Sequence, residues 1–145
     1  MARVAAVRRA IFARHCHPWS AWTRWASTPL TLVPVWTRRP SHALAVAVWL
    51  AVNPVVFGKP EHLDAWSTRA MLGEELWITE RPRDGAALLS IVTSAIALRA
   101  AIAARRHQLR PAVVSVAAQM ALTMLYWQLM VRYLARHQPA ADAHQ

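Results

Sequence analysis

Two histidines and a cysteine stand together near the start of the chain, and a metal site is the sharpest chemistry that they suggest. His15, Cys16 and His17 carry nitrogen and sulfur donors, which zinc and other transition metals bind. His62 and Glu74 follow in a second polar block, and the metal-site hypothesis takes His15, His17 and His62 as ligands. On a helix His15 and His17 would lie about 200° apart, so both could bind one metal only from an extended turn.

Signatures of other catalytic sites are missing from the sequence. Three glycines are too few for a glycine-rich phosphate loop, and no His-Glu-x-x-His or paired Cys-x-x-Cys occurs. Arg69 with Glu74 and Glu75 could form an acid–base centre, but we favour a solvated face on which Arg69 pairs with one carboxylate. We therefore expect a non-enzymatic protein that needs no cofactor. The alternative is a membrane-interface enzyme or metal protein that uses His15, His17, His62 and Glu74.

The composition indicates a membrane protein. Of the 145 residues, 56% are hydrophobic and 17% are charged, and the mean hydropathy is +0.19. A soluble domain usually has about 25% charged residues. Residues 111–131 contain no charge, and at about 1.5 Å per residue they can cross a hydrocarbon core of roughly 30 Å. We predict an all-α polytopic bundle in the cell (plasma) membrane of a prokaryote.

Three segments are strong membrane spans and a fourth is weak. The strong ones are residues 41–58, 86–104 and 111–131. The weak one is 20–37, whose apolar part, 25–36, contains Pro29 and Pro34, each of which removes a backbone donor. This part either crosses with a kink or dips into the membrane and returns. The prediction is three to four transmembrane helices plus an interfacial amphipathic helix.

The interfacial helix is predicted within residues 59–84, which hold six of the seven acidic residues. A helix over 62–77 would have one face formed by Leu63, Trp66, Ala70, Gly73 and Trp77, and we expect it to pack over the mouth of the bundle. Tryptophan suits the membrane interface. The chain thus divides into a basic interfacial segment (1–19), the membrane spans, this acidic Trp-rich helix and a disordered tail (137–145), all within a single membrane domain (1–145).

Small residues recur every four positions in the strong spans, as at helix contacts in membranes. They are Ala43, Ala47 and Ala51, then Ala86, Ser90 and Ser94, then Ala117 and Ala121. We expect these stripes to pack against other helices, within the chain, in a homo-oligomer or in a larger membrane complex. A small transporter is a further alternative, suggested by polar residues within apolar segments: Asn53 before Pro54, Arg99, Gln119 and Gln128.

The charge distribution indicates contact with lipid. The formal net charge is +10, and the arginines cluster at the borders of apolar segments, where they can reach anionic headgroups. No nucleic-acid-binding motif accompanies them, so we expect no nucleic acid partner. Eleven basic residues lie on the N-terminal side of the membrane and six on the other side, whether or not residues 25–36 cross. The positive-inside rule therefore places the N-terminus in the cytoplasm, but it leaves the side of residues 59–84 open.

Several blocks of the sequence occur in the order of a family pattern. They are His17-Pro18-Trp19-Ser20-Ala21-Trp22-Thr23-Arg24, Asn53-Pro54-Val55-Val56-Phe57, then Trp66, Arg69 and Gly73-Glu74. This order resembles an uncharacterised family of small prokaryotic membrane proteins, a domain of unknown function, over residues 14–77. That family has an Asn-Pro-Trp-Ser-x-Trp-Thr-Arg block, and His17 stands here in place of its asparagine. The resemblance implies that the blocks act together but implies no reaction. The candidate functional cluster is His15, His17, Trp19, Arg24, Asn53, Trp66, Arg69 and Glu74.

Overall fold

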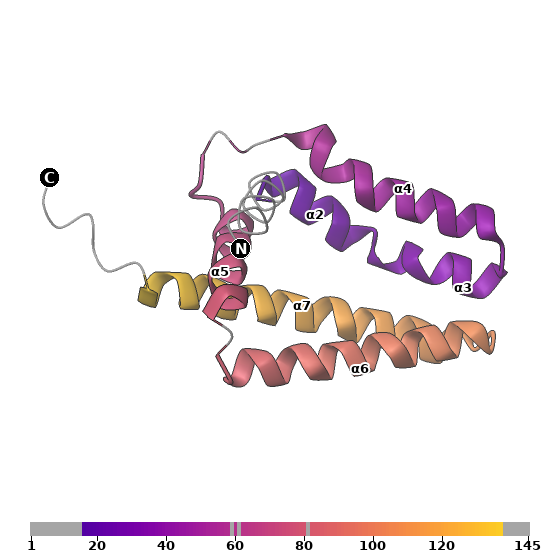
Figure 1. Ribbon diagram of the computed structural model, residues 1–145. Coiled ribbons are helices and arrows are strands. Elements are labelled where there is room, and N and C mark those ends of the chain that lie inside the picture. The colour runs from indigo at the N-terminus through magenta and orange to yellow at the C-terminus, as the bar shows by residue number, and fades with distance from the viewer. Residues whose placement is uncertain (1–15, 59, 61, 81, 138–145) are drawn as a thin grey trace, which may run out of the picture.

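The computed structural model describes residues 16–58, 60, 62–80 and 82–137, and these residues form an all-helical bundle (Figure 1). The all-α prediction is thus confirmed. The elements in chain order are α2 (Pro18–Ala26), the 3-10 helix η1 (Thr28–Leu32), α3 (Val33–Thr37), α4 (Pro40–Phe57), α5 (Trp66–Glu80), α6 (Gly85–Arg105) and α7 (Leu109–His137).

Three of these helices, α4, α6 and α7, are long and apolar enough to cross a membrane. They contain the three predicted strong spans almost entirely. Helix α6 begins after Asp84, whose carboxylate accepts hydrogen bonds from the N–H groups of Ala86 and Ala87 at 3.0 and 3.1 Å and so caps the helix. Helix α7 is longer than the predicted span of residues 111–131, since it begins at Leu109 and continues to His137. Residue 137 is therefore helical, and the rest of the predicted tail lies outside the described residues.

The first segment is a broken helix that runs from one end of the bundle to the other. At its start, the Cys16 carbonyl accepts a hydrogen bond from Thr68 of α5 at 2.6 Å. At its far end, Arg38 donates to the Arg105 carbonyl, beside the α6–α7 turn, at 3.2 Å. In Figure 1, α2 and α3 lie along α4, which returns in the opposite direction. Residues 25–36 thus traverse the bundle and do not turn back within it.

The breaks in this segment have local chemical causes. Pro29 and Pro34 each lack the N–H that a continuous helix would use. Hydroxyl groups then bond to nearby carbonyls: Thr28 Oγ1 donates to the Arg24 carbonyl at 3.4 Å and Thr31 Oγ1 to the Thr28 carbonyl at 2.6 Å. Such bonds satisfy backbone groups that would be costly to leave unpaired in a membrane.

Helix α5 packs on the C-terminal half of α7, at the end of the bundle where α2 begins (Figure 1). It spans Trp66–Glu80, whereas the predicted helix spanned 62–77. The start was predicted too early, so Leu63 lies before the helix and is exposed. The remaining members of the predicted face do pack inward, since Ala70 and Gly73 are buried and Trp66 and Trp77 are half-buried.

The small-residue stripes differ in their surroundings. In α6, Ala86 is buried. In α4, by contrast, Ala43, Ala47 and Ala51 are all exposed, as are Ala117 and Ala121 of α7. Within the described part of one chain, therefore, the α4 stripe packs against no other helix.

Candidate functional site

A buried hydrogen-bond network joins α2 to α4 around the side chain of Asn53. Asn53 is completely buried. Its Oδ1 accepts a hydrogen bond from Ser20 Oγ at 2.8 Å, and its Nδ2 donates to Thr23 Oγ1 at 2.7 Å. Helix α4 continues through Pro54 to Phe57. The side-chain amide of Asn53 therefore links α4 to α2. The helix α4 ends before Gly58, which has a φ of +68°.

Tryptophans from three helices form an aromatic cluster next to this network. The rings of Trp22, Trp66 and Trp127 lie with centroids 5.8 to 6.0 Å apart. Trp66 Nε1 also donates to Gln128 Oε1 at 2.9 Å, so Gln128 of α7 bonds to α5. Trp25 Nε1 donates to the Met120 carbonyl at 3.1 Å. Ring packing, together with the N–H bonds of Trp25 and Trp66, thus holds α2 and α5 against α7.

A cavity of about 240 Å³ lies beside this cluster, between α2, α5 and α7. Arg24 and Glu74 both line it, so the cavity is bordered by one cation and one carboxyl group. The rest of the wall mixes hydroxyl groups with apolar side chains: Ala21, Trp25, Thr28, Met71, Thr123 and Trp127. The Nε of Arg24 donates to the Ser20 carbonyl at 3.1 Å, which orients the guanidinium along α2.

The environment of Glu74 favours its protonated form. Burial raises the pKa of the Glu74 carboxyl above its usual value, and the hydrogen bond from Tyr126 and the charge of Arg24 oppose this rise. Tyr126 Oη donates to Glu74 Oε1 at 3.2 Å. Because burial is the largest of these influences, Glu74 takes up a proton more readily than an exposed glutamate does. A carboxyl of this kind in a cavity can bind and release protons or contact a polar ligand.

Replacement of Glu74 by glutamine is expected to change how stability depends on pH. An acid whose pKa is raised by folding holds its proton more tightly in the folded state. Its contribution to stability is therefore complete below the ordinary pKa of about 4.3 and is lost as the pH rises through the raised value. Wild-type protein should lose unfolding free energy over this interval relative to Glu74→Gln. The measurement is chemical unfolding in detergent across a pH series.

The neighbouring variant Glu75→Gln is the matched control for this prediction, because Glu75 does not line the cavity. It should follow the wild-type pH profile. If the profiles of wild type and Glu74→Gln run parallel, Glu74 does not titrate differently in the folded state.

The structure describes two of the three histidines of the predicted metal site, His17 and His62. His17 and His62 line one pocket at the start of α2, and the His17 ring stacks on Phe57 with centroids 5.6 Å apart. His15 lies outside the described residues. Among the residues that the structure does describe, no three histidine, cysteine or acidic side chains gather as a metal site would require. A site completed by His15 stays a prediction, which metal analysis of the purified protein can test.

Cys16 is buried in the core cluster that includes Ala21, Ala70 and Met71. Burial, together with the charges of Glu75 and Glu74, raises the pKa of its thiol to about 11. The thiol is therefore protonated near neutral pH and is a poor nucleophile. Its carbonyl has a structural role, as the acceptor for Thr68.

Three other sequence candidates lie apart from the cavity. Trp19 and Arg69 are exposed, and Arg69 forms no ion pair with Glu74 or Glu75. The predicted pairing was wrong: the cation that acts on Glu74 is Arg24, from another helix. Arg99 is exposed on α6.

Sequence reasoning missed one residue that α5 contributes and two that α7 contributes. Thr68, Tyr126 and Trp127 complete the contacts described above, but Tyr126 and Trp127 belong to an apolar span that resembles any membrane helix. The sequence feature that could have pointed to them is the run of two aromatic residues and an amide within that span, Tyr126-Trp127-Gln128. The sequence does not show which helix faces them.

The family comparison covers the part of the chain that supplies most of the site. A family model described as "Family of unknown function (DUF6653)" matches residues 1–84, which include Arg24, Asn53, Trp66 and Glu74. The resemblance seen over residues 14–77 is thereby confirmed. No curated protein and no solved structure matches the chain. More than half of its residues fit the family model, and the chain belongs to this family of unknown function, DUF6653.

Proposed function

We propose that this protein is a non-enzymatic membrane component that acts by packing against other membrane helices, in the first place those of a second copy of itself. The observation that carries the proposal is the open outer face of α4. Only Asn53 and Pro54 of its 18 residues are buried. The described contacts of α4 are with α2, η1 and α3 on one side.

The open face has the residues that favour close helix contact. Ala43, Ala47 and Ala51 form a stripe whose centre lies about 120° around the helix from Asn53. In a bilayer, lipid tails cover apolar surface as well as a helix does, so association depends on close packing and small residues promote it. The exposed stripe on α7, Ala117 and Ala121, is a second surface of the same kind.

The proposed arrangement has four crossings, with the N-terminus in the cytoplasm of a prokaryotic cell. The first segment runs the length of the bundle beside α4, and its 20 residues from Pro18 to Thr37 extend over roughly 30 Å at helical rises. This places the α3–α4 and α6–α7 turns on one side and α5 on the other. The basic residues then divide into eleven on the N-terminal side and six on the far side, which the positive-inside rule interprets as an inside N-terminus.

Single cysteines in a Cys16→Ala background test both parts of this proposal. Ala47→Cys lies on the stripe, whereas Val52→Cys is equally a membrane residue but lies about 140° away around the helix. In native membranes under mild oxidation, Ala47→Cys should give a disulfide-linked dimer and Val52→Cys should stay monomeric. A cysteine at Gln108, in the α6–α7 turn, should react with a membrane-impermeant maleimide in intact cells.

The results separate the possible arrangements. Monomers from both α4 variants would contradict self-association through this stripe, and a crosslink to a different protein would indicate a hetero-complex instead. Labelling of residue 108 only after the membrane is opened would reverse the proposed orientation.

A second function, the binding of a proton or a small polar solute within the membrane, is favoured by the Arg24–Glu74 cavity. Ionisable residues inside a membrane bundle are costly and usually functional. The cavity offers a guanidinium and a carboxyl group, and Thr28 and Thr123 add hydroxyl groups. The pH series with Glu74→Gln is its first test, since a Glu74 that titrates like an exposed glutamate has no special readiness to bind a proton.

A further inference from the structure

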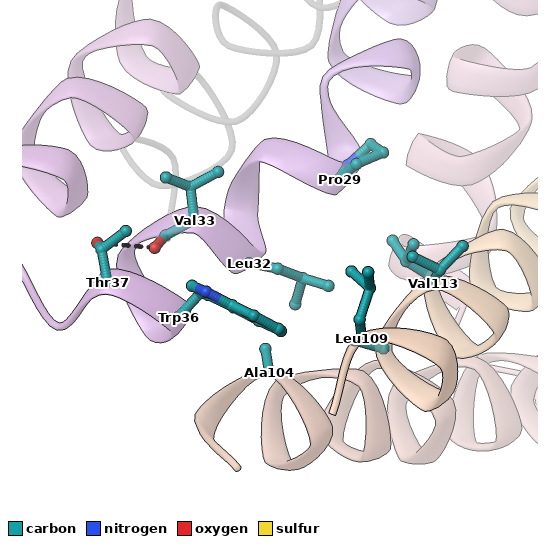
Figure 2. Close-up of a pocket in the computed structure, with 10 residues that line it drawn as sticks. Pro29, Leu32, Val33, Trp36, Thr37, Ala104, Leu109 and Val113 are labelled. Atoms are coloured by element: carbon teal, nitrogen blue, oxygen red, sulfur yellow. Dashed lines mark hydrogen bonds between the residues drawn. The ribbon is translucent and has the colours of Figure 1, made fainter. Parts of the chain in front are cut away.

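An apolar groove opens between the first segment and the α6–α7 pair, at the end of the bundle opposite α5 (Figures 1 and 2). Its volume is about 230 Å³. In Figure 2, Leu32 and Trp36 of the first segment point toward Leu109 of α7 across this space, and Ala104 of α6 forms its floor. The remaining lining residues are Pro29, Val33, Thr37, Ala112, Val113 and Val116.

The lining of the groove is almost entirely apolar. Apart from the indole N–H of Trp36, the polar group in its wall is the Thr37 hydroxyl, which already donates to the Val33 carbonyl at 2.8 Å (Figure 2). An occupant of the groove must therefore be apolar over the part that enters it.

Arginines surround the same end of the bundle. All are exposed: Arg38, Arg39, Arg105, Arg106 and Arg110. The chain holds Arg38 across the groove's end, because its Nη2 donates to the Arg105 carbonyl at 3.2 Å. His107, in the α6–α7 turn, lies edge-on to Trp36 with ring centroids 4.9 Å apart.

These positive charges have no carboxylate near them in the described part of the chain. Every described acidic residue lies in α5 or in the connections on either side of it, which is the other end of the bundle: Asp64, Glu74, Glu75, Glu80 and Asp84. Five like charges at one end of a membrane bundle repel one another and attract anions, and the phosphates of anionic lipids are the anions that a membrane surface supplies.

We infer that this end of the protein is a binding site for one anionic phospholipid, with an acyl chain in the groove and the headgroup among the arginines. The two halves of the site fit the two halves of such a lipid. A soluble anion would satisfy the arginines and leave the groove without an occupant, and a neutral lipid would fill the groove and leave the charges unbalanced. The inference does not depend on self-association through α4, which uses a different surface.

Native mass spectrometry of the delipidated protein in mild detergent tests the site. The protein is titrated with phosphatidylglycerol or with phosphatidylcholine of the same chain length. We expect one tight phosphatidylglycerol site, with an affinity at least about tenfold above that for phosphatidylcholine, since each arginine near a lipid surface contributes about 1 kcal/mol. Equal affinity for the two lipids would overturn the inference.

Two pairs of variants examine the headgroup and the acyl chain separately. Arg106→Gln/Arg110→Gln should lower phosphatidylglycerol affinity about tenfold or more. Its control, Arg132→Gln/Arg136→Gln, removes two exposed arginines with the same spacing at the other end of α7 and should leave the affinity unchanged. Val113→Trp should fill the groove and weaken both lipids, whereas Val114→Trp, an equally exposed neighbour outside the groove, should not.

The arginine variants change only exposed side chains, so they decide the matter even if Val113→Trp fails to fold. Equal losses from both arginine pairs would show general attraction to charge and overturn the site. A wild-type dimer that Val113→Trp dissociates, with no lipid preference, would assign the groove to a helix of a second copy and likewise overturn the inference.

Discussion

Replacement of Gly73 by alanine is expected to lower the free energy of unfolding by about 3 kcal/mol, toward the upper end of the effects of overpacking. A Cβ at Gly73 would lie 2.1 Å from the carbonyl oxygen and 2.7 Å from the carbonyl carbon of Met130. These are backbone atoms of α7, so no side chain can rotate to relieve the clash. Helix α5 must instead move away from α7, which disturbs the Trp22–Trp66–Trp127 cluster and the Glu74–Tyr126 hydrogen bond.

Gly85→Ala is the matched control for this variant. Gly85 is also helical, but a Cβ there meets nothing within 4 Å, so the change should be neutral or stabilising by up to about 1 kcal/mol. Both are measured by chemical unfolding in detergent, with tryptophan fluorescence as the signal. Equal stabilities for the two variants would show that the close approach of α5 and α7 does not exist in solution.

Asn53→Ala is expected to give the second large effect, a loss of about 1–2 kcal/mol. The substitution removes two hydrogen bonds from a completely buried amide and leaves the hydroxyls of Ser20 and Thr23 with fewer partners. Hydrogen bonds between membrane helices are each worth about 0.6 kcal/mol on average, and buried groups left unpaired add to the loss. The same unfolding experiment measures it.

A lipid-facing residue on the same helix controls for this change. Val55 is 61% exposed, and Val55→Ala should alter stability by less than about 0.5 kcal/mol. Combining Asn53→Ala with Ser20→Ala tests the network itself: the double variant should lose less than the sum of the two single losses. Strict additivity would mean that the Ser20–Asn53 contact contributes nothing.

The sequence was a good guide to the spans because its evidence is local. An uncharged apolar run such as residues 111–131 has few alternatives to a membrane helix, whatever it packs against. The broken course of residues 25–36 also followed from local chemistry, since Pro29 and Pro34 remove backbone donors wherever they stand. Whether that segment turned back or ran through could not be settled locally, because both courses contain the same breaks.

The errors concern relations between helices. Arg69 was expected to pair with Glu74 or Glu75, which are close to it in sequence, but Arg69 faces outward and Arg24 of α2 shares the cavity with Glu74. Asn53 was expected only as a polar residue within a span, whereas its side chain bonds to Ser20 and Thr23 of α2. That interaction depends on how α4 packs against α2, which no local rule contains.

By itself, the sequence determined the class of this protein: an all-helical bundle with three long apolar helices, positive charge at its borders and the blocks of its family in the first 84 residues. Composition and hydropathy act residue by residue, so they can be summed along the chain. Only the tertiary structure decided which polar groups meet. Arg24, Glu74 and Tyr126 come from three helices, and their contact depends on the rotation and depth of each helix, which close approaches such as that of Gly73 to Met130 set.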